Sequence, residues 1–192
     1  MDPLLLGTAS AFGLAAATGL NASLPLLLVG LAARFGPVTL VAPYDAVAST
    51  TALIGLGVLA LVEIAADKIP GFDSILHLVQ GPVAMAAGAI VFASQQSVVQ
   101  EVSPGFAIVV GLLSAGGVHT LRALARPVVN VATLGLGGPA VSVAEDVGAV
   151  SLTVLALAAP VLALVLLAVI LFVIGRAVAR RLTARRRPLR TT

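Results

Sequence analysis

The sequence predicts an all-α, polytopic transmembrane helix bundle with about five or six membrane segments, one or two of them broken or re-entrant. Hydrophobic residues make up 59% of the 192 residues and charged residues only 10%, whereas a soluble domain carries about a quarter charged residues. The stretches 3–33, 46–62 and 147–175 contain no charge at all, which suits a hydrocarbon solvent. Breaks at 21–25 and 135–139 interrupt apolar sequence and predict the broken helices.

The apolar stretches and the breaks between them give the expected helices in order. The first helix ends near Gly19, and a second runs from about 24 to 34 with Pro25 in its first turn. The later segments are expected at 46–66, 74–94, 105–126, 127–146 and 147–175. Pro127 is expected to kink or end the helix over 105–126, and Pro160 to kink the last span.

For two of these segments the sequence allows two different paths through the membrane. The piece 24–34 is too short to cross a hydrocarbon core of about 30 Å at about 1.5 Å per residue, so it either dips into the membrane or leans on the first helix. The piece 128–144 is interrupted by Gly and Pro and also either crosses or dips. Pro25, Pro82 and Pro139 are spaced 57 residues apart, which raises the possibility of an internal repeat of the kind found in transporters.

Charge divides the chain into a transmembrane domain, 1–175, and a basic tail, 176–192. Seven of the eleven basic residues lie in the tail, and the domain carries four basic and eight acidic residues. An Arg-rich segment after an apolar helix is expected on the cytoplasmic side, where it can contact anionic lipid headgroups. Binding to nucleic acid is not expected, because no aromatic residues interleave the arginines.

The residue inventory excludes several kinds of chemistry. The chain has no Cys, so no disulfide framework, thiol nucleophile or Cys-based metal site exists. No phosphate-binding loop, dinucleotide fingerprint or hydrolase motif occurs. We therefore expect no cofactor, and an enzyme is the less favoured class of function.

Acidic residues and histidines form the first candidate site. Glu63 and Asp67 lie four residues apart on one helix, and Asp73 and His77 repeat that spacing on the next. Groups so placed can relay protons or bind a cation. The alternative is that they are solvated residues at helix ends. Three further residues are assigned to the same coupling role: His119, Glu145 and Asp146. For the last two, favourable placement near a helix N-terminus is a sufficient alternative.

Basic and amide residues form the second candidate site. His119, Arg122, Arg126 and Asn130 share one face of a continuous helix. Arginine is the forked donor suited to phosphate or carboxylate, so this face is predicted to bind an anionic group. The alternative is a structural salt bridge from the arginines to Glu63 or to Asp67.

The breaks in the helices form the third candidate site. A helix that starts at 21–25 or at 135–139 would aim N–H groups with partial positive charge into the membrane interior. Asn21 and Ser23 would add neutral hydrogen bonds to a substrate there. The alternative is ordinary helix capping.

Four segments resemble the signature segments of an uncharacterised bacterial membrane family, domain of unknown function 4126. They read GLNASLP at 19–25, ADKIPGFD at 66–73, RPVVN at 126–130 and SVAED at 142–146. The resemblance covers roughly residues 8–175. It implies an integral domain of the bacterial cytoplasmic (inner) membrane, and it implies no particular activity.

Together these features predict a small transporter or channel-like protein for a small anionic solute, an ion or a lipid phosphate. A chain of this size is expected to form a homo-oligomer to enclose a pathway. One alternative is an accessory or structural subunit of a larger membrane complex. Another is an intramembrane enzyme acting on a lipid headgroup through Mg²⁺, bound by five carboxylates: Glu63, Asp67, Asp73, Glu145 and Asp146.

Overall fold

The computed structural model describes residues 2–36, 38–66, 73–95, 98, 100–132 and 138–185. Within these residues the fold is all-helical, and the one β-type pairing is an isolated antiparallel bridge between Leu40 and Gln95. The described elements, in chain order, are α1 (Pro3–Leu20), α2 (Ser23–Phe35), the 3-10 helix η1 (Tyr44–Ala48), α3 (Thr50–Ala66), α4 (Asp73–Ala93), α6 (Pro104–Ala132), α7 (Gly138–Ala158) and α8 (Pro160–Arg185).

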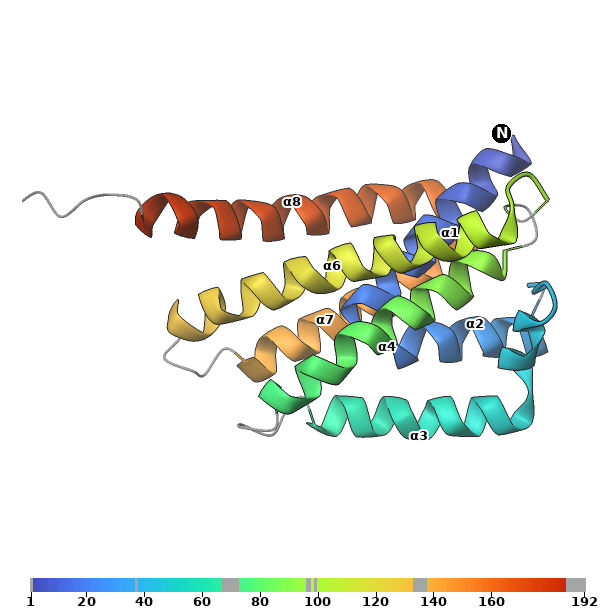
Figure 1. Cartoon of the computed structure of the whole chain (residues 1–192), viewed down its shortest axis with the longest axis horizontal. Helices are drawn as coiled ribbons and strands as arrows, with labels where there is room; N and C mark the ends of the chain where they lie inside the picture. Colours follow the sequence, from blue (N-terminus) through green and yellow to red (C-terminus); the bar gives the residue numbers. More distant parts are fainter. Residues whose placement is uncertain are drawn as a thin grey trace, which may run out of the picture.

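The helices α3, α4, α6, α7 and α8 run along the long axis of the bundle, each in the direction opposite to the one before it (Figure 1). α1 passes obliquely between them and packs against α4, α6, α7 and α8. α2 packs against α3, α7 and η1. The bundle therefore has α1 as its central helix and the other helices around it.

α1 and α2 form a helical hairpin whose turn lies inside the bundle. α1 begins at the end marked N in Figure 1, and α2 runs back toward that same end. α2 has 13 residues, about 20 Å at about 1.5 Å per residue. Both residues of the connection, Asn21 and Ala22, are buried. Within the bundle, the piece expected at 24–34 therefore dips inward from one end and does not run through to the other.

Local sequence explains where α1 begins. The Asp2 carboxylate accepts a hydrogen bond from the Leu4 N–H at 3.0 Å, and Pro3 occupies the first helical position. Both are favourable at a helix N-terminus, where the first N–H groups have no partner within the helix.

The last apolar stretch is two helices and not the single kinked span expected over 147–175. α7 ends at Ala158, and α8 begins at Pro160 and returns alongside α7 (Figure 1). Proline lacks an N–H and clashes with a preceding helical turn, but the first position of a helix accepts it. Pro160 therefore starts a new helix here.

The stretch 127–146 is not one broken segment. α6 continues through Pro127 to Ala132, and α7 begins at Gly138. Glu145 and Asp146 consequently lie inside α7, in its second and third turns, and not at the start of the last span. Capping of a helix N-terminus, the alternative role for these two carboxylates, is therefore wrong.

The spacing of 57 residues between prolines does not correspond to a repeated structure. Pro25 is the third residue of α2 and Pro139 the second residue of α7. Pro82 lies in the middle of α4. The three prolines therefore occupy different positions in their helices.

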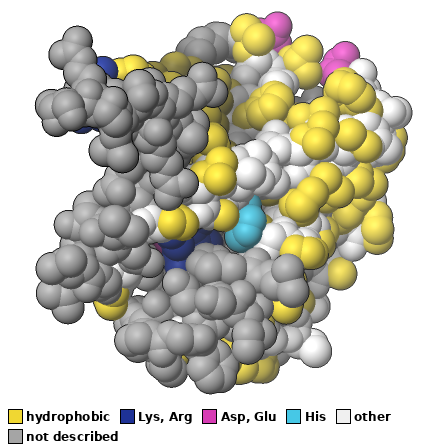
Figure 2. Space-filling view, turned by 60° about the vertical axis from the view of Figure 1, so that its left-hand side comes forward, with side chains coloured by type: hydrophobic (Ala, Val, Ile, Leu, Met, Phe, Trp, Pro, Cys, Tyr) yellow, Lys and Arg dark blue, Asp and Glu magenta, His cyan; other side chains and the backbone are white. Residues whose placement is uncertain are grey.

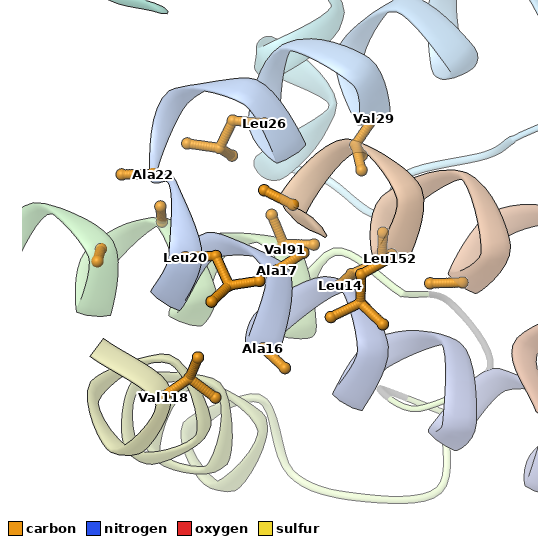
Figure 3. Packing of buried hydrophobic residues seen from close by; sticks show 14 of the residues in the cluster. Leu14, Ala16, Ala17, Leu20, Ala22, Leu26, Val29, Val91, Val118 and Leu152 are labelled. Carbon is orange, nitrogen blue, oxygen red and sulfur yellow. The ribbon is translucent and has the colours of Figure 1, made fainter. Parts of the chain in front are cut away.

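The core is built around α1 (Figure 3). Leu14 and Leu20 of α1 belong to one buried cluster with Val29 of α2, Val91 of α4 and Leu152 of α7. Most of the α1 residues in the core are small, which allows the surrounding helices to approach closely. This packing fixes the depth at which the turn after α1 lies.

α4 and α6 approach each other at a pair of glycines. A Cβ on Gly111 would lie 2.6 Å from the Cβ of Phe92, and a Cβ on Gly88 would lie 2.8 Å from the Gly111 carbonyl oxygen. No side chain fits at either distance. Glycine at these two positions is therefore a condition of the α4–α6 contact.

The outer surface is strongly apolar. Large hydrophobic side chains are exposed along α3, α6 and α8, among them Ile54, Leu61, Leu113, Val165 and Phe172. On the face shown in Figure 2, basic side chains and a histidine lie in a recess near the centre. Within the described residues, two helices are long and apolar enough to cross a membrane, Pro104–Pro127 and Gly138–Ala158. An exposed apolar surface of this extent is untypical of a soluble monomer.

Candidate functional site

The turn between α1 and α2 carries a set of polar groups that we call the α2 cap: Asn21, Ala22, Ser23 and Glu63. The Asn21 side chain Oδ1 accepts hydrogen bonds from the N–H of Ser23 at 3.1 Å and of Leu24 at 3.0 Å. Asn21 therefore satisfies two of the N–H groups that a helix start leaves open. The capping alternative considered for this break is correct for Asn21.

Glu63 of α3 reaches the same helix start. Its Oε2 accepts a hydrogen bond from the Ser23 hydroxyl at 2.7 Å and a longer one from the Ser23 N–H at 3.3 Å. Its Oε1 accepts from the Ala22 N–H at 3.4 Å. The carboxylate thus lies where the partial positive charge of the α2 N-terminus is directed. Glu63 is 8% exposed, so this is a buried carboxylate bound by neutral donors.

A third helix joins at the other side of Asn21. The Asn21 Nδ2 donates a hydrogen bond to the Asp146 Oδ1 of α7 at 2.9 Å. The turn between α1 and α2 therefore forms hydrogen bonds with both α3 and α7 and also caps α2. The sequence predicted Asn21, Ser23, Glu63 and Asp146 as site residues, and the structure brings all four together.

The second polar group, which we call the arginine cluster, consists of Arg122, Arg126 and Glu145. The Glu145 Oε2 lies 2.9 Å from Arg122 Nε and 2.6 Å from Arg126 Nη2. Arg126 Nε also donates to Glu145 Oε1 at 3.4 Å. Both arginines are buried, Arg122 to 3% exposure. One carboxylate of α7 thus bridges two cations of α6.

Among the described residues the arginines pair with Glu145, which was not considered as their partner from the sequence. The expected alternative paired Arg122 or Arg126 with Glu63 or with Asp67. Among the described residues Glu63 forms its hydrogen bonds with Ala22 and Ser23, whereas Glu145 forms the ion pairs with the two arginines. Helix spacing places residues on one face but does not say which helix that face meets. Asp67 lies outside the described residues.

The remaining predicted site residues are placed as follows. His119 is buried on α6, one turn before Arg122, and packs against Gly81 of α4, where a Cβ would lie 3.3 Å from its Nε2. The other residues lie in helices whose side chains at those positions are outside the described set: Asp73 and His77 in α4, and Asn130 in α6.

A cavity of about 100 Å³ opens beside the α2 cap, between α3 and α4. We call it the lateral cavity. Its lining combines three polar residues, Ser23, Glu63 and Gln80, with four aliphatic ones, namely Leu59, Val62, Val79 and Val83. Gln80 was not predicted from the sequence. A signal for it exists, because Gln80 is an amide within the apolar stretch 74–94 and lies three residues after His77.

The described residues contain no group of three or more His, Cys, Asp or Glu side chains that could hold a metal ion. Glu63 and Asp146 lie on opposite sides of the Asn21–Ser23 turn, and Glu145 faces arginines. A magnesium-dependent enzyme would need the side chains of Asp67 and Asp73, which fall outside the described set.

The fold and the site define an all-helical protein with an apolar exterior, helices able to cross a membrane and a buried polar centre. The chain belongs to the family described as "Domain of unknown function (DUF4126)", whose sequence profile matches residues 8–180. No curated protein matches the chain, and no solved structure does so either.

Proposed function

We propose that the chain is a multi-pass protein of the bacterial cytoplasmic membrane, with its C-terminal tail on the cytoplasmic side. The support is the apolar outer surface, the alternating direction of α3, α4, α6, α7 and α8, and the position of the charges. Arg122 and Arg126 lie in the half of α6 that leads toward the end of the bundle where α8 ends (Figure 1). Excess basic residues on one side mark the cytoplasmic face.

Single cysteines would test this topology, because the natural chain contains none. Gln100→Cys places a thiol in the α4–α6 connection, and Thr191→Cys places one in the tail. We expect a membrane-impermeant maleimide added to intact cells to label the first variant and to label the second only after lysis. Labelling of both in intact cells would contradict the proposed topology.

We further propose that the protein is a small transporter or channel-like protein. The observation that supports this most directly is the α1–α2 hairpin, which brings a helix start and two neutral polar side chains into the bundle, where carboxylates of α3 and α7 meet them. Broken helices whose ends meet polar groups at membrane depth form substrate and ion sites in transporters. Buried ionisable residues at such depth are costly and commonly functional.

The arginine cluster is the proposed site for an anionic solute or a lipid phosphate. Two arginines share one carboxylate, so these three residues together carry one net positive charge. An incoming phosphate would exchange with Glu145 for the same donors, because guanidinium groups bind phosphate and carboxylate with similar geometry. In this proposal Glu63 and Asp146 carry the coupling proton or cation.

Flux measurements on the purified protein in liposomes would test the solute class. We expect protein-dependent uptake of radiolabelled inorganic phosphate, roughly tenfold lower in Arg126→Gln. Arg176→Gln, which removes an exposed arginine near the end of α8, is the matched control and should keep the wild-type rate. Equal uptake by empty and protein-containing liposomes would contradict phosphate transport.

A second candidate is an accessory subunit of a larger membrane complex. It is favoured by the arginine cluster, because an ion pair in place between α6 and α7 is what a purely structural role requires. Native mass spectrometry after mild detergent extraction would separate the two candidates. A homo-oligomer, which our transporter proposal expects, would contradict the accessory role, and a stoichiometric foreign partner would support it.

A further inference from the structure

The lateral cavity is an apolar crevice in the outer surface of the bundle. Its walls are formed by two aliphatic side chains of α3, Leu59 and Val62, and by two of α4, Val79 and Val83. All four are partly exposed, from 40% for Val83 to 58% for Val79, so the cavity opens sideways onto the apolar exterior. Among the described residues α3 lies at the edge of the bundle and packs mainly against α2 and η1 (Figure 1). The cavity is therefore a gap between α3 and α4.

The polar residues that border the cavity do not give it a polar surface. The Ser23 hydroxyl and the N–H groups of Ala22 and Ser23 donate to the Glu63 carboxylate, so these groups bind one another at the α2 cap. The surface of the cavity is formed almost entirely by carbon atoms. Water in such a space would lack hydrogen-bond partners, and an apolar cavity accordingly stays dry and accepts apolar molecules. The ligand class that this surface fits is a hydrocarbon.

The volume of the cavity limits the size of an occupant. At about 100 Å³, it is smaller than the apolar cavity of about 150 Å³ that holds one benzene molecule. It equals about three water molecules at roughly 30 Å³ each, and a methylene group is of similar size. The space therefore accommodates the last few carbon atoms of one alkyl chain but no lipid headgroup.

The depth of the cavity selects the part of a lipid that can reach it. Polar residues mark the end of the bundle where α3 begins and α4 ends, Thr50 and Ser94 among them. Leu59 lies nine residues after the start of α3, and Val83 ten residues before the end of α4, about 14 Å and about 15 Å at roughly 1.5 Å per residue. Half of a hydrocarbon core of about 30 Å is about 15 Å. In the membrane placement proposed above, the cavity therefore lies near the midplane, where the methyl ends of lipid chains meet.

We infer that the lateral cavity binds the methyl end of a membrane-lipid acyl chain, which enters sideways between α3 and α4. The lipid tail completes the contact between these two helices that their described side chains leave open. The inference rests on the proposed membrane location. It is independent of the proposed transport function, because no charged group takes part in the binding.

Photolabelling of the full chain in phosphatidylcholine liposomes tests this inference. The probe is phosphatidylcholine with a diazirine at the methyl end of one acyl chain, and mass spectrometry of peptides measures the label at each residue. Leu113 of α6 and Val169 of α8 are the internal controls. Both lie nine residues into their helices from the same end of the bundle, and both are more exposed than Leu59 and Val83, at 64% and 53%. We expect at least fivefold more label at the four wall residues, because a bound tail remains in contact with them.

Three other outcomes would overturn the inference. Equal labelling of the cavity and the controls would show only passing contact with bulk lipid. Labelling of the controls with none at the cavity would show that a side chain of a second copy or of a partner fills the space. Absence of label at every position would contradict the membrane location on which the inference rests. This comparison within the natural chain needs no variant.

Filling the cavity locates the binding. Val62→Phe/Val83→Phe enlarges one side chain on each wall, and we expect the label at Leu59 and Val79 to fall to the level of the controls. Full label at these two residues in folded Val62→Phe/Val83→Phe protein would overturn the inference.

A matched pair of substitutions controls for the added bulk. Val161→Phe/Val173→Phe makes the same change at two exposed positions of α8 and should leave the label in the cavity unchanged. Unchanged label at Leu113 in both double variants shows that each protein is still folded in the membrane.

Discussion

The two buried glutamates of this protein have opposite surroundings. Glu145 of the arginine cluster contacts two guanidinium groups, whereas Glu63 of the α2 cap is bound by one hydroxyl and two backbone N–H groups. A carboxylate paired with fixed cations is costly to remove but has little left to offer a ligand. A carboxylate held by weaker, neutral donors can exchange them. The comparison therefore predicts that removing the charge of Glu145 costs more stability than removing the charge of Glu63.

The largest effect is expected from removing the charge of Glu145. Glu145→Gln takes away the carboxylate that Arg122 and Arg126 share, and breaking a buried pair costs about 3–5 kcal/mol. We expect a loss of about 3 kcal/mol in the free energy of unfolding, measured by urea titration in nonionic micelles. Glu63→Gln, which keeps an oxygen for the Ser23 hydroxyl, should cost about 1 kcal/mol.

A double-mutant cycle between Glu145→Gln and Arg126→Gln sharpens this result. The two substitutions together should cost less than the sum of the single ones, by about 1–3 kcal/mol, because the residues are in contact. Strict additivity would show that Arg126 and Glu145 do not stabilise one another, and the comparison of the two glutamates would fail.

The next largest loss of stability is expected from a substitution that disturbs helix packing and leaves the charge unchanged. Gly111→Ala would bring a methyl group within 2.6 Å of the Phe92 Cβ, and overpacking of this kind costs about 1–3 kcal/mol. Gly117→Ala is the control on the same helix, because nothing lies within 4 Å of its Cβ position. The control should be neutral or stabilising by up to about 1 kcal/mol. Equal effects at both positions would mean that α4 and α6 are not packed at the glycine pair.

The smallest effect is expected from the hydroxyl at the α2 cap. Ser23→Ala removes the 2.7 Å hydrogen bond to Glu63, which is worth about 1 kcal/mol to unfolding. Ser114→Ala is a suitable control, since that hydroxyl bonds the Val110 carbonyl of its own helix at 2.7 Å. The control should change stability by less than about 0.5 kcal/mol. A loss at Ser23 as large as that at Glu145 would remove the distinction between the two regions.

Much of the helical plan could be predicted from the sequence. The segments expected at 46–66, 74–94 and 105–126 correspond to α3, α4 and most of α6, because long apolar stretches between polar breaks strongly favour helices of that length. The break at 21–25 was also predicted, together with the polar residues that define it. These features depend on neighbours in the chain, which the sequence displays directly.

The errors concern relations between distant segments. The sequence places Arg122 and Arg126 on one helical face, but which helix meets that face depends on the packing of all the others. The long apolar stretch after Glu145 predicts a helix start close to this residue, but α7 begins earlier, at Gly138. Pro160 starts a new helix where the sequence predicts only a kink. Proline spacing suggested a repeat that the helices do not follow, because the same residue can start a helix or lie inside one.

Glu145 and Asp146 are neighbours on α7 but contact different parts of the molecule. Glu145 pairs with the arginines of α6, and Asp146 accepts a hydrogen bond from Asn21 of the α1–α2 turn. Consecutive residues of an α-helix point about 100° apart, so a single rigid rod holds both polar groups at a fixed angle. Any rotation of α7 about its axis that loosens one contact must displace the other. α7 can therefore transmit movement between the two sites. An anion that displaced Glu145 from its arginines would rotate α7, and Asp146 would then displace Asn21 and the turn at the start of α2.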